Sequence, residues 1–217
     1  MEIVSNNTNS SDREVPTGNR RFCVGNEVAR HYYERISSKR IRRTVFVWNI
    51  EAFSEKHTVR RMTVGDTDII YGLCVGNPLY YEYCPPFVTR ESIGEDLTAL
   101  PPNTSEEQKH YVGFFDSKKL LAVMDIIDGY PGKGIAFIGF FMVEEGEQGK
   151  GTGSEIITEV VDYLEKEGYT AVRLAWVMGN PQAEHFWRKN GFKVIKETSG
   201  TDGSRLMLAE RKCGQEE

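Results

Sequence analysis

Alternating and continuous apolar runs predict strands in the middle of the chain. Three such runs, separated by turn residues, lie at Tyr111–Phe115, Leu120–Ile127 and Ile135–Val143. The turns between them contain Asp116-Ser117 and the glycine-rich segment 129–134. Short apolar runs spaced in this way are typical of an antiparallel meander. The sequence therefore predicts three consecutive antiparallel strands at the centre of the fold.

After the third strand the hydrophobic period changes from two to 3.6 residues. Five aliphatic residues then fall on one helical face: Ile156, Ile157, Val160, Val161 and Leu164. This pattern predicts an amphipathic helix that opens at Ser154 and stops at Gly168.

Shorter elements are predicted on both sides of this central part. Before it, the pattern indicates a strand at Val59–Val64 and helices at Ile69–Val75 and Thr89–Leu100. After it, the pattern indicates a strand at Thr170–Val177, a helix between Asn180 and Gly191, and strands at Phe192–Lys196 and Arg205–Leu208. The order βααβββαβαββ predicts an α/β (α+β) fold with a mixed, mostly antiparallel central sheet flanked by helices.

The ends of the chain look different from this domain. Residues 1–19 are rich in Asn, Ser and Thr, which predicts a disordered tail or a leader. Residues 20–56 form a basic N-terminal extension whose role the sequence does not indicate. We expect the folded domain over residues 57–211 and a short tail over residues 212–217.

Composition narrows the class of protein. The chain has 217 residues, of which 39% are hydrophobic and 27% charged, as in one folded globular domain. No apolar stretch approaches the ~20 residues of a membrane helix. The first twenty residues lack the apolar core of a secretory signal. We therefore expect a cytoplasmic protein with no membrane partner.

The net charge of −5 is unevenly distributed along the chain. Residues 1–61 hold 12 Lys and Arg against 7 Asp and Glu, whereas residues 62–217 hold 15 against 25. A basic arm can attract nucleic acid, but a basic run is more often a solvated helix face. Nucleic acid is therefore not an expected partner.

The four cysteines, Cys23, Cys74, Cys84 and Cys213, are scattered and form no CxxC pair. Neither a zinc site nor a disulfide scaffold is indicated by this spacing. We expect free thiols and no metal.

The most informative segment is the glycine-rich run between Val143 and Ser154, which joins a strand to the amphipathic helix. Gly149, Gly151 and Gly153 alternate, so the backbone can turn and present N–H groups to an anion at the positive end of the helix. A phosphate or diphosphate site is one interpretation, and a tight glycine-rich turn is the other.

Two common phosphate motifs do not fit this run. A Walker loop would need glycine at Glu144 and Ser or Thr at Gly151. A GxGxxG fingerprint that starts at Gly149 or Gly151 would need glycine at Ser154 or Ile156. Both motifs are therefore excluded by spacing.

The motif that fits is Gln148-x-x-Gly151-x-Gly153. It resembles the Q/RxxGxG/A pyrophosphate loop of the GNAT superfamily of N-acetyltransferases, which bind acetyl-coenzyme A (acetyl-CoA). The segment NPQAEHFWRKNGF, from Asn180 to Phe192, resembles the family's NxxAxxFYxxxGF segment. The resemblance covers roughly residues 57–211 and implies a GNAT-like fold in which two strands splay apart to hold acetyl-CoA.

The resemblance also implies which residues bind the coenzyme. The loop backbone would wrap the pyrophosphate, and the third meander strand would pair with the pantetheine arm, where its N–H groups would polarise the thioester carbonyl. The implied coenzyme-binding residues are Phe141, Met142, Val143, Gln148, Gly149, Lys150, Gly151, Thr152, Gly153, Ser154, Asn180 and Phe186. For Lys150 a solvated side chain is the alternative, and Asn180 can also serve as a helix cap.

Two positions depart from the family pattern for catalysis. Attack of an amine on a thioester needs a base, donors for the oxyanion and, in some enzymes, an acid for the thiolate. Trp187 stands where many members have a tyrosine acid, and an indole cannot deliver a proton to a thiolate. Phe137 stands where some members have a glutamate base. The groups that move protons must therefore be others.

Asp125 and Glu144 are the catalytic candidates. Asp125 lies inside an apolar strand, where an unpaired carboxylate is costly and its pKa is expected to rise. Glu144 lies at the mouth of the glycine loop. Asp128 and Tyr130 belong to an ordinary turn sequence, and His185 is expected on a helix surface, so these three are weaker candidates.

The acceptor is expected to bind at residues 77–87, because the first helices and their loop recognise acceptors in this family. Tyr80, Tyr81, Glu82 and Tyr83 would suit a cation, through aromatic faces and a carboxylate. The alternative is that the tyrosines are packing residues with wet hydroxyls.

The sequence thus predicts an acetyl-CoA-dependent N-acetyltransferase, which transfers acetyl to a primary amine of a small molecule or peptide by direct attack on the thioester. One alternative is a non-catalytic acyl-CoA-binding or regulatory module. The other is a nucleic-acid-associated acetyltransferase that uses the basic N-terminal arm. The oligomeric state is open, with a homodimer as one option.

Overall fold

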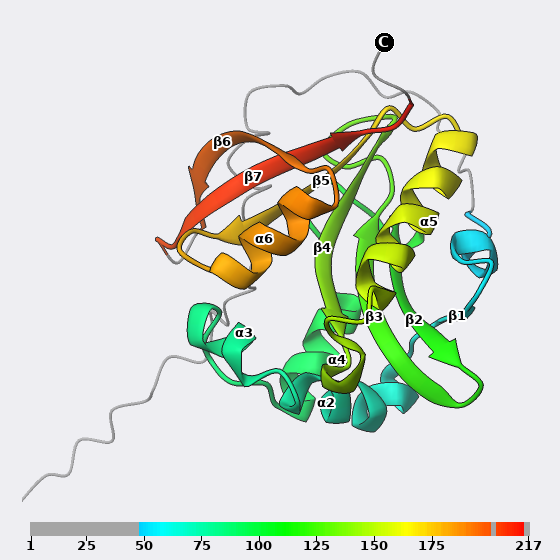
Figure 1. Ribbon diagram of the computed structural model, residues 1–217, viewed down its shortest axis with the longest axis vertical. Helices are drawn as coiled ribbons and strands as arrows, with labels where there is room; N and C mark the ends of the chain where they lie inside the picture. Colours follow the sequence, from blue (N-terminus) through cyan, green and yellow to red (C-terminus); the bar gives the residue numbers. More distant parts are fainter. Residues whose placement is uncertain (1–47, 201–202, 215–217) are drawn as a thin grey trace, which may run out of the picture.

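A seven-stranded sheet with the strand order β1-β2-β3-β4-β5-β7-β6 forms the centre of the molecule, a computed structural model that describes residues 48–200 and 203–214 (Figure 1). The strands are β1 Thr58–Arg61, β2 Lys109–Asp116, β3 Lys119–Ile127, β4 Ile135–Val143, β5 Ala171–Val177, β6 Lys193–Ser199 and β7 Arg205–Lys212. Strands β4 and β5 pair in parallel, and all other neighbours are antiparallel. The predicted mixed, mostly antiparallel sheet and its meander β2-β3-β4 are confirmed.

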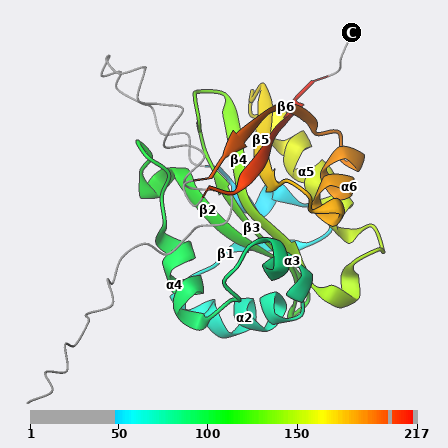
Figure 2. The ribbon, with the colours of Figure 1, turned by 90° about the vertical axis from the view of Figure 1, so that its left-hand side faces the viewer.

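Helices cover both faces of this sheet. They are α2 Thr67–Val75, α3 Pro78–Tyr83, α4 Arg90–Thr98, α5 Thr152–Lys166 and α6 Pro181–Lys189. Helices α2, α3 and α4 lie on one side of the sheet and α5 and α6 on the other (Figures 1 and 2). A separate hydrophobic cluster fills each side, with the α5 stripe in one cluster and residues of α2 and α4 in the other. None of the helices in the described ranges is long and apolar enough to span a membrane.

The helix-capping residues that the sequence indicates form hydrogen bonds with the first turns of their helices. Thr89 caps α4 by accepting from the Ser92 N–H at 3.1 Å. Asn180 caps α6 by accepting from the Ala183 N–H at 3.0 Å, and Pro181 takes the first helical position.

Several boundaries differ from the prediction, three of them as follows. Gly76-Asn77-Pro78 ends α2 as expected, but the same residues begin the short helix α3, which was expected to be a loop. Strand β1 stops at Arg61, because a short 3-10 turn follows at Val64–Asp66. Strand β7 runs on to Lys212, because it pairs with β5 along its whole length. The residues that begin and end helices were therefore easier to recognise in the sequence than the residues at which strands end.

The packed domain begins before residue 57. Trp48 and Phe53 are buried in the same hydrophobic cluster as α5. The Trp48 ring stacks on His110 with 4.6 Å between centroids, and its Nε1 donates to the Tyr169 hydroxyl at 3.0 Å. This packing ties residues 48–53 to strand β2 and to the end of α5. The predicted tail 1–19 and most of the basic extension lie outside the described residues.

Candidate functional site

Strands β4 and β5 pair only over their first halves. Ile135–Ile138 pairs with Ala171–Leu174, and no pairing between the two strands follows. At the point of divergence Gly139 forms a bulge, since Asp125 pairs with Phe140 whereas its neighbour Ile126 pairs with Ile138. The second halves of β4 and β5 therefore leave a cleft between them.

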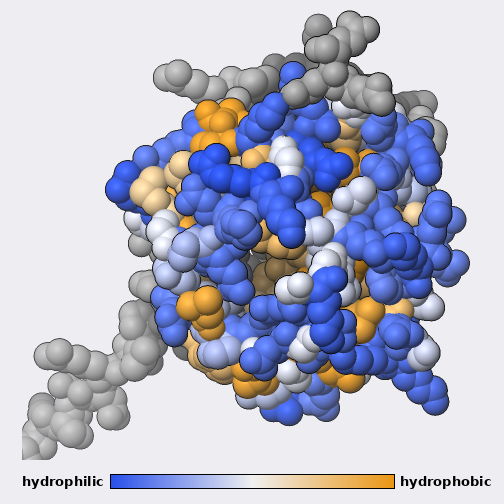
Figure 3. Space-filling model, in the orientation of Figure 1, coloured by the Kyte–Doolittle hydropathy of each residue, from blue (hydrophilic) through white to orange (hydrophobic). Residues whose placement is uncertain are grey.

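A cavity of about 370 Å³ occupies this cleft. Its walls come from the second half of β4, the glycine loop, the end of β5, helix α6 and, at one end, residues of the α3 segment. Figure 3 shows a hollow in the middle of this face, with apolar residues inside it and polar residues around its rim. The predicted coenzyme-binding residues that line it are Phe141, Met142, Val143, Gln148, Gly149, Gly151, Gly153, Ser154, Asn180 and Phe186. The structure thus brings together ten of the twelve, and Lys150 and Thr152 lie outside its lining.

The glycine loop has the backbone geometry of an anion site. Gly149 and Gly151 have φ of 73° and 97°, values that favour glycine, and a Cβ at either would meet nothing within 4 Å. Gly151 is the N-cap of α5 and makes no side-chain cap, so the first N–H groups of this 15-residue helix have no partner within the helix. A diphosphate fits this open helix end.

Gly153 is required for a different reason. A Cβ there would lie 3.0 Å from Val143 Cγ2 and 3.2 Å from the Phe186 ring. Its small size lets α5 pack closely between the end of β4 and helix α6. The loop therefore contains two glycines for backbone shape and one for packing.

Several acidic side chains surround the loop, and lysines balance them. Lys119 Nζ lies 3.0 Å from Glu144 and 2.8 Å from Glu147, while Lys150 lies 3.6 Å from Glu147. The Gly146 N–H and Lys119 hold the pKa of the Glu144 carboxyl below its ordinary value. Glu144 is not among the residues that line the cavity, whereas Glu147 is. A carboxylate stabilised as an anion in this way is a weak base.

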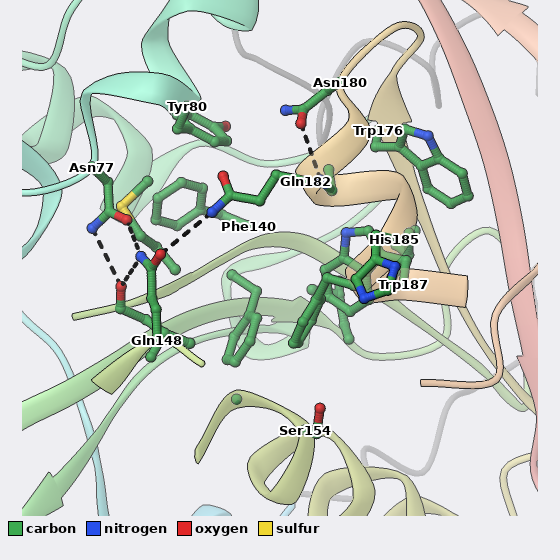
Figure 4. Close-up of a pocket in the computed structure, with 18 of the residues that line it drawn as sticks. Asn77, Tyr80, Phe140, Gln148, Ser154, Trp176, Asn180, Gln182, His185 and Trp187 are labelled. Atoms are coloured by element: carbon green, nitrogen blue, oxygen red, sulfur yellow. Dashed lines mark hydrogen bonds between the residues drawn. The ribbon is translucent and has the colours of Figure 1, made fainter. Parts of the chain in front are cut away.

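A chain of side-chain amides crosses the mouth of the cavity (Figure 4). Gln148 Nε2 donates to Asn77 Oδ1 at 2.5 Å and to the Val143 carbonyl at 3.2 Å. From the other side, Gln182 Nε2 donates to Gln148 Oε1 at 3.3 Å. These bonds connect the start of α3, the glycine loop and helix α6.

Helix α6 supplies an aromatic wall. Phe186 stacks on Phe141 with 5.9 Å between ring centroids, and Trp187 packs against Phe141, Phe186 and Phe192. His185 is exposed, as expected for a helix surface, but it also lines the cavity. An imidazole is a group that can accept or release a proton in such a position.

Asp125 lies next to the cavity wall and not in it. Its Oδ2 is 2.6 Å from Lys109 Nζ, and both residues are buried, with exposed fractions of 7% and 4%. Burial raises the pKa of the Asp125 carboxyl, as expected from the sequence, and Lys109 opposes that rise. Asp125 is absent from the cavity lining. Its role as a general base stays a prediction.

The predicted acceptor segment forms helix α3 and the turn after it. Tyr80 lines the cavity and contacts Phe140 edge to face, with 5.6 Å between the ring centroids. Tyr81 packs against Phe87, with ring centroids 4.8 Å apart. Tyr81, Glu82 and Tyr83 do not belong to the lining. Of the four predicted residues, only Tyr80 is therefore placed where a ligand in the cavity would touch it.

Trp176 and Gln182 line the cavity although the sequence did not single them out, while Asn77 and Cys84 belong to the expected acceptor segment 77–87 and His185 was a weaker catalytic candidate. Gln182 and His185 occupy variable positions of the recognised NxxAxxFYxxxGF segment, so their helix was known and their direction was not. Asn77 carried a signal that could have been used, since Asn77-Pro78 repeats the Asn-Pro helix start of Asn180. Cys74, Cys84 and Cys213 are thiols and form no disulfide. No group of three or more metal-binding side chains occurs among the described residues.

The family model described as the acetyltransferase (GNAT) family matches residues 77–192, which is more than half of the chain. The protein therefore belongs to the GNAT family and is an acyltransferase of the N-acetyltransferase type. A search of curated protein sequences found no match.

Solved structures share this fold. An acetyltransferase from Thermus thermophilus aligns with a TM-score of 0.62 at 20% identity, over 72% of this chain and 97% of that one. The ribosomal-protein-S18-alanine N-acetyltransferase from Escherichia coli aligns at 0.53 and 15% identity, over 74% and 96%. The paia N-acetyltransferase from Thermoplasma acidophilum, solved in complex with coenzyme A, aligns at 0.54 and 17% identity, over 72% and 98%. At these identities the likeness shows the fold alone.

Proposed function

We propose that this protein transfers the acetyl group of acetyl-CoA to a primary amine of a small molecule or a peptide, by direct attack of the amine on the thioester. The observation that carries the proposal is the cavity between the splayed halves of β4 and β5, which joins the open glycine loop to helix α3. A coenzyme bound from the loop side and an amine bound from the α3 side would meet in it.

The residues present fit the coenzyme. The N–H groups from Gly149 to Ser154 would hold the diphosphate, and the narrow cleft beside Phe141, Met142 and Val143 would hold the pantetheine arm. The bound thioester supplies the activated acetyl group. N–H groups on the cleft edge of β4 would stabilise the oxyanion that forms when the amine attacks, because fixed donors need no reorganisation.

Proton transfer is the step for which the cavity offers the fewest groups. Trp187 fills the place of the family's tyrosine acid, and neither Asp125 nor Glu144 lines the cavity. His185 lines it and can exchange protons, so it joins Asp125 as a candidate. The proposed reaction has three steps. The acceptor ammonium loses a proton, the resulting amine attacks the carbonyl carbon of the thioester, and the coenzyme leaves as a thiolate, which then takes up a proton.

The acceptor site is proposed on the α3 side. Tyr80 with Phe140 offers aromatic faces to a cationic amine, and Glu82 is exposed on the same helix. This arrangement supports an amine acceptor and does not separate a small molecule from a peptide.

The test is amine-dependent release of coenzyme A thiol from acetyl-CoA. Primary amines, polyamines and peptides with free N-termini or lysines would be screened, with mass spectrometry of the amine to detect the added acetyl group. We expect thiol release and acetylated amine in equal amounts. Binding of acetyl-CoA without turnover on any amine would instead support the non-catalytic acyl-CoA-binding module, which the absence of the tyrosine acid also favours.

A further inference from the structure

We propose that Asn77 is a positioning residue that couples the glycine loop to helix α3, so that a ligand at the loop also orders the acceptor side of the cavity. The inference rests on the proposed function of the loop as the coenzyme site. It adds a connection between the two halves of the site that neither the fold nor the motif implies.

The chain contains two Asn-Pro helix starts, and they behave differently. Asn180, before Pro181, caps its helix by accepting from the Ala183 N–H at 3.0 Å. Asn77, before Pro78, makes no side-chain cap at the start of α3. A cap of this kind typically stabilises a helix measurably. Helix α3 therefore lacks a stabilising bond that its own sequence could provide.

The Asn77 side chain is instead committed to other segments (Figure 4). Its Oδ1 accepts from Gln148 Nε2 at 2.5 Å, and its Nδ2 donates to the Leu73 carbonyl at 2.9 Å and the Val143 carbonyl at 3.3 Å. Gln148 Nε2 also donates to the Val143 carbonyl, at 3.2 Å. The start of α3 is thereby fastened to the end of α2, the end of β4 and the first residue of the loop motif.

The hydrogen bond that connects Gln148 to helix α6 is weaker than the bonds that connect it to Asn77 and Val143. Gln182 donates to Gln148 Oε1 at 3.3 Å, the longest of the three bonds that the Gln148 amide makes, and all three are exposed to solvent. On the other side, the short bond to Asn77 is reinforced by the shared Val143 carbonyl. When an anion draws the loop N–H groups towards itself, the Gln182 bond gives way first. The displacement of Gln148 then reaches Asn77.

Helix α3 is suited to respond to such a displacement. It has six residues, none of them buried, and a helix this short has little stability of its own. Tyr80 and Cys84, at its middle and its end, both form part of the cavity wall. Because coupling between sites is reciprocal, an amine that orders α3 also favours the loop conformation that binds the coenzyme.

The experiment measures amide hydrogen exchange with 3′-phospho-ADP, the nucleotide part of coenzyme A, which carries the diphosphate and lacks the pantetheine arm that would reach α3. In the wild-type protein, saturating nucleotide slows exchange in residues 144–154 and, by about fivefold or more, in residues 79–84. In Asn77→Ala the loop keeps its protection and the response of residues 79–84 is lost.

Thr89→Ala is the matched control, because it removes a real helix cap from the same helical layer without touching the amide chain. It should keep the α3 response. With an amine found active in the screen, Asn77→Ala should raise the amine KM about fivefold and leave kcat within about twofold. The coupling alone is overturned if the nucleotide still slows exchange in residues 79–84 of Asn77→Ala. It is also overturned if the nucleotide protects the loop of the wild-type protein and leaves exchange in residues 79–84 unchanged. A wild-type loop that the nucleotide does not protect overturns the coenzyme site as well.

Discussion

Lys109 Nζ lies 2.6 Å from Asp125 Oδ2 in the interior of the protein, on neighbouring strands beneath helices α2 and α4. Two opposite charges buried together stabilise each other, and removal of one leaves the other without its ion-pair partner. This relationship determines how a substitution at Asp125 must be interpreted, because the residue is also a candidate base.

Asp125→Asn is expected to lower the free energy of unfolding by about 3–5 kcal/mol, since it leaves the buried Lys109 charge unpaired. The double variant Asp125→Asn with Lys109→Met should regain a large part of this loss. Urea unfolding of the wild type and both variants measures the effect. Wild-type stability in Asp125→Asn would contradict the buried ion pair.

The same double variant tests the reaction. If Asp125 is the general base, kcat/KM falls ~10²-fold even where stability is restored. Wild-type turnover in the folded double variant would remove Asp125 from the proton-transfer step.

His185→Gln tests His185 as a candidate for proton transfer, a residue that the sequence predicted on the helix surface. Because His185 lines the cavity, its loss should lower kcat at least ~10-fold. Arg188→Gln is the control, since Arg188 lies on the same helix outside the cavity lining and pairs with Glu184. Equal activity of the two variants across the pH range would argue against a role for His185.

Trp187→Phe should affect stability more than turnover. The indole packs against three phenylalanine rings in the core, so the smaller ring should cost about 1–2 kcal/mol of unfolding free energy. An indole provides no acid, so kcat should change little. A large loss of kcat at unchanged melting temperature and coenzyme affinity would show that Trp187 takes part in the chemistry.

Stability should fall in mild acid because of His110, which is 1% exposed. Burial and the neighbouring Arg61 lower the pKa of His110 to about 4. In the unfolded chain the pKa is about 6.5, so as the pH falls the unfolded state takes up the proton first. The contribution of the neutral His110 to the free energy of unfolding is therefore fully present above pH ~6.5, and it decreases by about 2 kcal/mol when the pH falls to 5. Urea unfolding of the wild type and of His110→Gln at pH 6.5 and pH 5 measures this decrease. An equal loss of unfolding free energy at pH 5 in the two proteins would refute the role of His110.

The glycine loop and the helices could be predicted because their signals are local. The change of hydrophobic period after Val143 and the glycines at alternate positions depend on no distant residue. The same holds for the caps at Thr89 and Asn180, which bond within their own first turns. These features were enough to locate the glycine-loop side of the cavity.

The other features depend on register between distant segments. The cleft opens where β4 leaves β5, at the bulge at Gly139, and no local pattern states how far two strands pair. Lys109 meets Asp125 only because β2 and β3 are aligned as they are. Asn77 and Gln148 lie 71 positions apart in the sequence and meet only in the folded chain. The α3 side of the cavity and the neighbours of Asp125 were therefore the least predictable parts.

The affinity of Gly151→Ala for acetyl-CoA, measured by titration calorimetry, tests the coenzyme site most directly. Gly151 has a φ of 97° at the start of α5, and Gly168 has a φ of 82° after its end, with nothing within 4 Å of a Cβ at either. Alanine therefore strains the backbone similarly at both positions, but only Gly151 lines the cavity. We expect Gly151→Ala to weaken binding at least tenfold, by ~1.4 kcal/mol or more, and Gly168→Ala to bind as the wild type does. Unchanged affinity in a folded Gly151→Ala variant would contradict a coenzyme site at this loop.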